Sequence, residues 1–185
     1  MIKFLGYVFL VLLLLVAGAL LFVRFVSHDP AQWHVDPLTA PTPATPNSWR
    51  VAPPGQSPGA AGTQSPVYRA TPAELMAAFD RIATAQPETE RLAGTPEVGF
   101  ITYVQRTPLV KYPDYISVKA VDLGEGMSAL AILSRSRFGR SDMGVNKARI
   151  TEWLKGLKDM EDTAAPTALP APAVATAPSV SPTGG

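Results

Sequence analysis

The chain has 185 residues, a formal net charge of +1 and no cysteine. The near-neutral charge excludes the strongly basic surface with which proteins bind nucleic acids. The lack of cysteine excludes disulfides, thiolate metal sites and a cysteine nucleophile. Of the 19 prolines, nine lie in 28–66 and five in 161–185, so only residues 67–160 have the composition of a globular domain.

The N-terminal segment 1–27 is predicted to be a transmembrane anchor. Residues 4–23 are 20 uncharged, mostly apolar residues, and a helix of that length spans about 30 Å, the thickness of a bilayer's hydrocarbon core. The alternative is a secretory signal cleaved after Ala-Gly-Ala at 17–19, which would leave an apolar start to the mature chain. A single span with a short preceding tail predicts a bacterial inner-membrane protein whose domain faces the periplasm.

Proline-rich segments flank the candidate domain. Residues 28–66 are predicted to be a linker without regular structure, although some of its large side chains are expected to pack on the membrane surface or on the domain. A fully disordered tether is the alternative. These large side chains are Trp33, His34, Leu38 and Trp49. Residues 161–185 are almost uncharged and of low complexity, which predicts a disordered tail.

Residues 67–160 are predicted to form one α+β domain. Thr71, Pro72 and Glu74 have the spacing of a capping box, which opens a helix that ends before Pro87. Hairpin-length connections predict a small antiparallel sheet of about four strands with two helices packed on it. The expected strands are 88–94, 98–106, 114–122 and 127–137, and the expected second helix is 145–160.

The sequence offers few groups for catalysis. His28 and His34 precede the domain and have no carboxylate or cysteine at ligand spacing, so no metal site is expected. The domain has no histidine to activate a serine, no glycine loop for phosphates and no clear carboxylate pair. We therefore expect no catalytic residues and no cofactor. The favoured function is a non-enzymatic binding or accessory domain, with a membrane protein as a candidate partner.

Residues 134–146, which read SRSRFGRSDMGVN, are the strongest candidate for a site. Strand alternation places Arg135 and Arg137 on one face, and Asp142 can cap the next helix. In a binding interpretation, the arginines and the helix start hold an anion such as a phosphate or lipid head group, as in a carrier or an enzyme. The candidate ligand-binding residues are Arg106, Asp114, Arg135, Arg137, Asp142 and Asn146.

A structural interpretation of the same stretch is favoured. Asp142 would then cap the helix and pair with Arg137 or Arg140, while Asp114 would pair with Arg135. A carboxylate at the start of the helix competes with any incoming anion, which argues against a binding site.

The stretch also resembles the signature of a bacterial and plastid family, the domain-of-unknown-function family 1499. The signature runs roughly R-S-x-S-R-x-G-x-S-D-x-G-x-N. The matching residues are Ser134, Arg135, Ser136, Arg137, Gly139, Ser141, Asp142, Gly144, Asn146 and Arg149. Looser matches lie at Arg106, Thr107, Leu109, Asp114 and 46–49, where Ser48 replaces a cysteine that members often carry. The resemblance covers about 33–158 and implies a membrane-tethered or exported domain that includes 33–50, without implying an activity.

Overall fold

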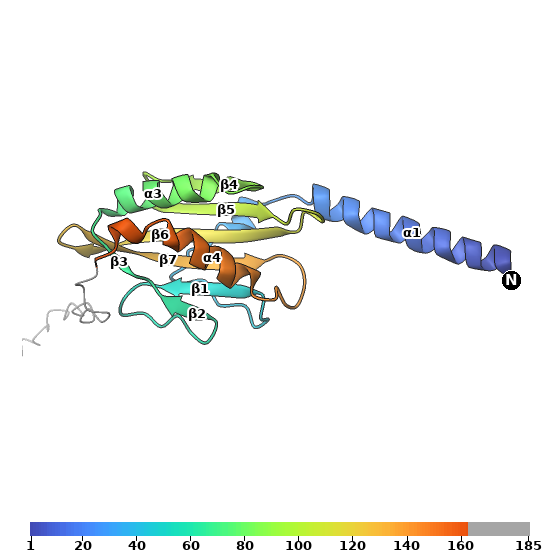
Figure 1. Ribbon diagram of the computed structural model, residues 1–185, viewed down its shortest axis with the longest axis horizontal. Coiled ribbons are helices and arrows are strands. Elements are labelled where there is room, and N and C mark those ends of the chain that lie inside the picture. Colours follow the sequence, from blue (N-terminus) through green and yellow to red (C-terminus); the bar gives the residue numbers. More distant parts are fainter. Residues whose placement is uncertain (163–185) are drawn as a thin grey trace, which may run out of the picture.

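A long N-terminal helix and an α+β domain make up residues 1–162, the part of the chain that the computed structural model describes (Figure 1). Helix α1, Ile2–Phe25, extends away from the domain, and only its last turn packs against it, where Val23 is 8% exposed. Lys3–Phe25 has a mean hydropathy of 2.8 and is long and apolar enough to cross a membrane, a test that a signal sequence also passes. The disordered tail predicted at 161–185 lies, from residue 163 onward, outside the described residues.

The domain is built on one mixed sheet of seven strands in the order β2-β1-β7-β6-β5-β4, with β3 pairing with the start of β7. The strands are β1 (Ser48–Ala52), β2 (Gly62–Gln64), β3 (Val67–Tyr68), β4 (Thr89–Thr95), β5 (Phe100–Arg106), β6 (Pro113–Gly124) and β7 (Met127–Ser136). Strands β4 to β7 form an antiparallel meander close to the positions predicted from the sequence. Strand β1 pairs antiparallel with β7 and parallel with β2.

The sheet is larger than the four strands expected from the sequence. Two of the three additional strands, β1 and β2, lie in the proline-rich region 28–66, where regular structure was not expected, and β3 follows directly after it. Each has at most five residues, so its local pattern is weak. Strands β1 and β3 form because the free edge of the long strand β7 presents backbone N–H and C=O groups that need hydrogen-bond partners, and β2 then pairs with the free edge of β1. The prolines of this region fall between the strands, where no ladder hydrogen bond is lost.

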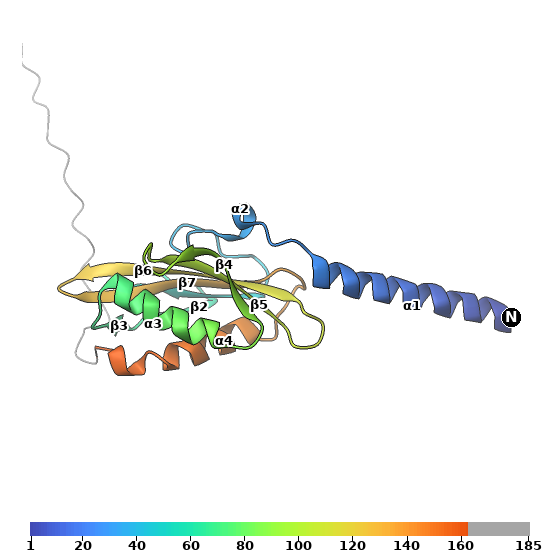
Figure 2. The same cartoon turned by 90° about the horizontal axis from the view of Figure 1, so that it is seen from above.

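Helices α3 (Pro72–Thr84) and α4 (Val145–Lys155) cover one face of the sheet (Figure 2). A short 3-10 helix, Lys158–Met160, follows α4. The predicted capping box is present: the Thr71 hydroxyl accepts from the Glu74 backbone N–H, and the Glu74 carboxylate accepts from that of Thr71. The core between helices and sheet is centred on three aromatic rings with centroids 5.8 to 6.2 Å apart, namely Phe79, Tyr103 and Trp153.

The opposite face of the sheet is covered by the linker segment, residues 26–36, which contains helix α2 (Pro30–Trp33) (Figure 2). Two aromatic side chains of this segment stack on the sheet with nearly parallel rings. The stacked pairs, with centroids 3.8 and 3.9 Å apart, are Trp33 on Tyr115 and His34 on Phe100. The chain between α1 and the domain therefore lies on the sheet as a packed layer.

Candidate functional site

Strand β7 divides the predicted site residues between the two faces of the sheet. Its side chains alternate, so Ser134 and Ser136 face the helices, whereas Arg135 and the following Arg137 face the linker segment. This is the alternation predicted from the sequence. Consequently the six candidate ligand-binding residues do not form one site. Asp114, Asp142 and Asn146 lie on the helix side, and Arg106, Arg135 and Arg137 on the linker side.

Arg149 on α4 is the centre of a buried polar network on the helix side. Its guanidinium donates to Asp114 Oδ2 and Gln105 Oε1, each at 2.5 Å, and to Asn146 Oδ1 at 2.7 Å. Ser134 Oγ donates to the same Asn146 oxygen at 2.5 Å. The Arg149 and Asp114 side chains are 7% and 5% exposed, and charges so deeply buried need partners of this kind. The helix-side network, comprising Gln105, Asp114, Ser134, Asn146 and Arg149, thus fixes α4 on three strands.

Asn146 joins the start of α4 to the sheet and to the preceding loop. Its Nδ2 donates to Asn47 O at 3.1 Å, Ser136 Oγ at 3.0 Å and Asp142 Oδ2 at 2.7 Å. Asp142 also accepts from the backbone N–H groups of Gly144 and Asn146, each at 2.9 Å. Burial acts to raise the pKa of Asp142, but these hydrogen bonds outweigh it and hold the pKa below its ordinary value. The N-cap position of α4 is Gly144, and Asp142, two residues before it, accepts from the first-turn N–H of Asn146, so it stabilises the start of α4 in the way that the structural interpretation expected of a cap.

The ion pairs expected from the sequence are not the ones that form. Asp114 pairs with Arg149 instead of Arg135, because Asp114 faces the helices whereas Arg135 faces the linker segment. Within residues 1–162, Asp142 forms no ion pair with Arg137 or Arg140. The expected pairs do not form because the two aspartates lie on the helix side of the sheet, whereas Arg135 and Arg137 lie on the linker side. Closeness in the sequence does not show on which face of the sheet a side chain lies.

On the linker side, arginines hold the linker segment on the sheet. Arg135 Nη2 donates to the Trp33 carbonyl at 3.3 Å, and its guanidinium carbon lies 4.8 Å from the Trp33 ring centroid. Arg137 Nη1 donates to the Ser27 carbonyl at 2.7 Å and to the Tyr115 hydroxyl at 3.0 Å. Donors that would hold an anion in the binding interpretation, Arg135 Nη2 and Arg137 Nη1, are thus engaged by the protein's own backbone. The linker clamp, as we call this group, comprises His28, Trp33, Arg106, Tyr115, Arg135 and Arg137.

His28 connects two members of the linker clamp. Arg106 Nη2 lies 2.8 Å from His28 Nε2, and His28 Nδ1 lies 2.7 Å from the Tyr115 hydroxyl. Arginine can only donate, so Nε2 must accept and the imidazole must be neutral. Burial, together with the charges of Arg106 and Arg137, lowers the pKa of His28. The ring therefore acts as a hydrogen-bonded bridge between the linker segment and the sheet.

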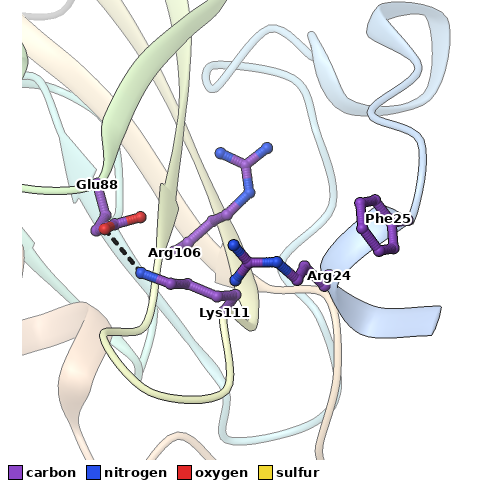
Figure 3. A pocket seen from close by; sticks show the side chains of 5 residues that line it. All are labelled: Arg24, Phe25, Glu88, Arg106 and Lys111. Carbon is purple, nitrogen blue, oxygen red and sulfur yellow. Dashed lines mark ion pairs between the residues drawn. The ribbon is translucent and has the colours of Figure 1, made fainter. Parts of the chain in front are cut away.

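A basic pocket of about 350 Å³ lies where the end of α1 meets the sheet (Figure 3). It is lined by Arg24, Phe25, Glu88, Arg106 and Lys111. Lys111 Nζ pairs with Glu88 Oε1 at 2.7 Å. Of these residues, only Arg106 was predicted to belong to a site. Arg24 precedes the linker, far from Arg106 in the sequence, and Lys111 lies in the loop that follows β5.

A second pocket, of about 330 Å³, opens beside the helix-side network. Its walls include the carboxylates of Asp114 and Asp142 and the apolar side chains of Tyr112, Phe138 and Val145. Two carboxylates disfavour an anion, so the binding interpretation of the 134–146 stretch finds no support in this pocket. Among residues 1–162, no group of three or more His, Asp or Glu side chains is placed to hold a metal ion.

Sequence reasoning missed Arg149 and Tyr115 as organisers of these groups, and for Trp33 it predicted packing on the membrane surface or on the domain without naming the partner ring. Arg149 was noted only as a match to the family signature, although its helical spacing of three from Asn146 places both on one side of α4. Trp33 and Tyr115 were separated by about 80 residues, and no periodic pattern links them. Their contact follows from the linker segment folding back over β6.

The chain matches a protein-family model, described as a protein of unknown function (DUF1499). The match covers residues 39–157, which include all seven strands and helices α3 and α4. No curated protein matches the chain. The signature residues of 134–149 form the helix-side network, the cap of α4 and part of the linker clamp. Since the family model matches more than half of the chain, the protein belongs to the DUF1499 family.

Proposed function

We propose that the protein is a membrane-anchored domain of the bacterial envelope that stands on the periplasmic face of the inner membrane and binds a partner there without catalysis. The observation that carries this proposal is the continuous path from α1 into a linker segment packed on the sheet. A domain held in this way has a defined orientation to the bilayer, which suits it to present a surface to a neighbouring membrane protein.

The anchor is supported by the length and hydropathy of α1 and by its exposed side chains. Its apolar surface has no cover within residues 1–162 beyond the last turn, and lipid is the environment that accepts such a surface. Arg24 follows the apolar run, where its side chain can reach the head groups.

The non-enzymatic role is supported by what the polar side chains of the domain already do. Asp114 is tied to Arg149 in a buried pair, and Ser134 donates to Asn146. Both histidines contribute to packing of the linker segment, since His28 bridges Arg106 to Tyr115 and His34 stacks on Phe100. The alternative, a carrier or an enzyme with an anionic ligand at the arginines, would require the linker segment to leave the sheet first.

Two measurements test this proposal. Extraction of membranes with alkaline carbonate should leave the full-length chain in the pellet, and reporter fusions after residue 30 should be active only for reporters that work outside the cytoplasm. Purification in mild detergent should then yield a stable complex with a membrane protein. Release by carbonate or activity of a cytoplasmic reporter would overturn the topology, and a monomer from native membranes would overturn the accessory role.

A further inference from the structure

The end of the domain next to α1 is formed by two loops, residues 107–112 after β5 and residues 137–144 after β7 (Figure 1). The Phe22 ring in the last turn of α1 contacts Phe138, with centroids 6.2 Å apart, and Phe138 contacts Tyr112 at 5.9 Å. A helix needs about 20 residues to cross the hydrocarbon core, so Phe22 lies near its boundary. The two loops then lie at the level of the lipid head groups.

These loops expose apolar side chains. Leu109 is 92% exposed and Met143 is 94% exposed. Tyr112, whose ring contacts Phe138, is 42% exposed. Exposed apolar groups beside a membrane helix, accompanied by aromatic rings, are typical of a surface that enters the interface. Val98 is also 73% exposed, but it lies in the β4–β5 turn at the opposite end of the sheet. There the backbone N–H of Ala120 donates to the carbonyl of Gly99. Val98 therefore provides a matched control.

The basic pocket opens at the same end of the domain. Figure 3 shows three cationic side chains lining the pocket from α1, from the end of β5 and from the following loop, namely Arg24, Arg106 and Lys111, with the Lys111 amine directed at Glu88 and the Arg106 guanidinium directed away from it. Glu88 and Glu90 pair with Lys111 and Arg106, so the three cations and two carboxylates leave one positive charge. Within residues 1–162, Arg24 forms no ion pair, although its charge contributes after Lys111 to lowering the pKa of Glu88, so it is the cation of the pocket most available to an anion. Phe25 adds an apolar wall.

Backbone conformation singles out this end of the domain as well. Three of the four non-glycine residues with positive φ within residues 1–162 lie here, and the fourth lies in a hairpin turn. They are Glu88 at 57°, Lys111 at 64° and Met143 at 52°. A non-glycine residue keeps a positive φ only where its surroundings enforce this backbone conformation, and such residues are concentrated at binding sites. Two of the three residues, Glu88 and Lys111, form the ion pair that lines the basic pocket.

We propose that this end of the domain is a membrane-contacting surface, in which Leu109 and Met143 enter the interface and the basic pocket binds the phosphate of an anionic phospholipid. The inference rests on the proposed anchoring by α1, since α1 sets the depth of both loops. An anionic phospholipid fits the pocket because one net positive charge matches a phosphodiester, while Phe25 and the neighbouring apolar tips match the start of the acyl chains. The bilayer also delivers this ligand at the depth of Arg24.

Insertion of the loops can be measured with single cysteines, because the chain has none of its own. Leu109→Cys, Met143→Cys and the control Val98→Cys are labelled with an environment-sensitive fluorophore in the full-length protein in nanodiscs that contain phosphatidylglycerol. Labels at 109 and 143 should show blue-shifted emission and quenching by lipids brominated near the head group, and the label at 98 should show neither. Equal quenching of all three labels by aqueous iodide would overturn the insertion.

Lipid selection can be measured by native mass spectrometry of the full-length protein purified with equal amounts of phosphatidylglycerol and phosphatidylcholine. The wild type should retain phosphatidylglycerol preferentially. Arg24→Gln and Lys111→Gln should each reduce the preference about fivefold, the weight of one basic residue at an anionic surface. The exposed Lys158→Gln, at the far end of α4, should leave it unchanged. Equal retention of the two lipids by the wild type would overturn the pocket assignment.

Inorganic phosphate separates lipid from a soluble anion. If bound phosphatidylglycerol stays in place when phosphate is added, the result supports a lipid site. The lipid assignment would be overturned if millimolar phosphate displaced the lipid and also protected 107–112 from hydrogen exchange in phosphatidylcholine nanodiscs. Carbonate extraction of the same samples distinguishes this failure from failure of the anchor. A chain that stays in the membrane but shows neither insertion nor selection contradicts this inference alone.

Discussion

Asp114 on β6 and Arg149 on α4 form an ion pair, Oδ2 to Nη2 at 2.5 Å, in which both side chains are less than one-tenth exposed. The pair is the point at which α4 is fixed to the sheet, and Gln105 and Asn146 occupy other donors of the same guanidinium. Each charge is compensated only by the other and by this network. Removing one partner should therefore lower the stability of the fold, because the other charge is left buried without a partner.

Arg149→Ala should lower the free energy of unfolding by about 3–5 kcal/mol, because it leaves the Asp114 carboxylate buried and uncompensated. Urea unfolding of the full-length chain in detergent, followed by tryptophan fluorescence, measures the loss. Lys155→Ala removes an exposed pair with Glu152 on the same helix and should change stability by less than about 0.5 kcal/mol. Similar small effects in the two variants would contradict a structural role for the buried pair.

Asn146→Asp should destabilise the fold by about 2–4 kcal/mol at neutral pH, because it removes buried donors and puts a second carboxylate 2.7 Å from that of Asp142. The raised pKa of the new carboxylate makes the loss smaller as the pH falls and it gains a proton. Adding Asp142→Asn to this variant should recover part of the stability by removing the repulsion. Denaturation curves at two pH values check both effects, and a loss that does not depend on pH would exclude the repulsion.

The sequence was sufficient for the parts of the fold that have a local cause. The capping box at Thr71, the β4–β7 meander and the alternation around Arg135 all follow from spacing within one segment. The strand β1 and the ring on which Trp33 stacks could not be predicted, since they depend on edges and rings supplied by distant strands, although packing of Trp33 on the domain was one of the two expected outcomes. The candidate site failed for a related reason. Residues close in sequence on β7 point to opposite faces, so one signature contributes to two separate structures.

The linker segment should detach more easily at acidic pH. The pKa of His28 is lowered below its ordinary value of 6.5 by burial and by Arg106 and Arg137, and burial also lowers that of His34. Because the free segment takes up a proton more readily than the docked one, the stabilisation is complete above about pH 6.5 and is lost as the pH falls through the lowered values. Hydrogen exchange of 27–36, corrected for the slower intrinsic exchange at lower pH, should therefore increase from about pH 7.5 to 5.

The control for this pH effect is the double variant His28→Gln/His34→Gln, in which neither side chain can gain a proton. Its exchange in 27–36, corrected for the intrinsic effect of pH, should be nearly constant over the same range. A wild type that behaves like the double variant would show that neither histidine links docking to pH.

Two tryptophans separate the linker layer from the helix layer. Trp33→Ala removes the ring stacked on Tyr115 and contacted by Arg135, and should raise hydrogen exchange in 27–36 at least tenfold while leaving α4 protected. Trp49 lies on the helix face of the sheet, beneath Lys147. Trp49→Ala should therefore increase hydrogen exchange in α4 while leaving 27–36 protected. Equal loosening of both layers by either variant would contradict two independent layers.

The central claim is that the arginines of the linker clamp fix the domain to its anchor, and a distance between spin labels tests it most directly. Ala31→Cys on α2 and Val98→Cys in the β4–β5 turn are both exposed and place labels on the linker segment and on the sheet. Double electron–electron resonance of the full-length protein in nanodiscs should give one narrow distance distribution, which broadens when Arg135→Ala and Arg137→Ala are added. A broad distribution in the wild type, or a narrow one that survives loss of both arginines, would contradict the account.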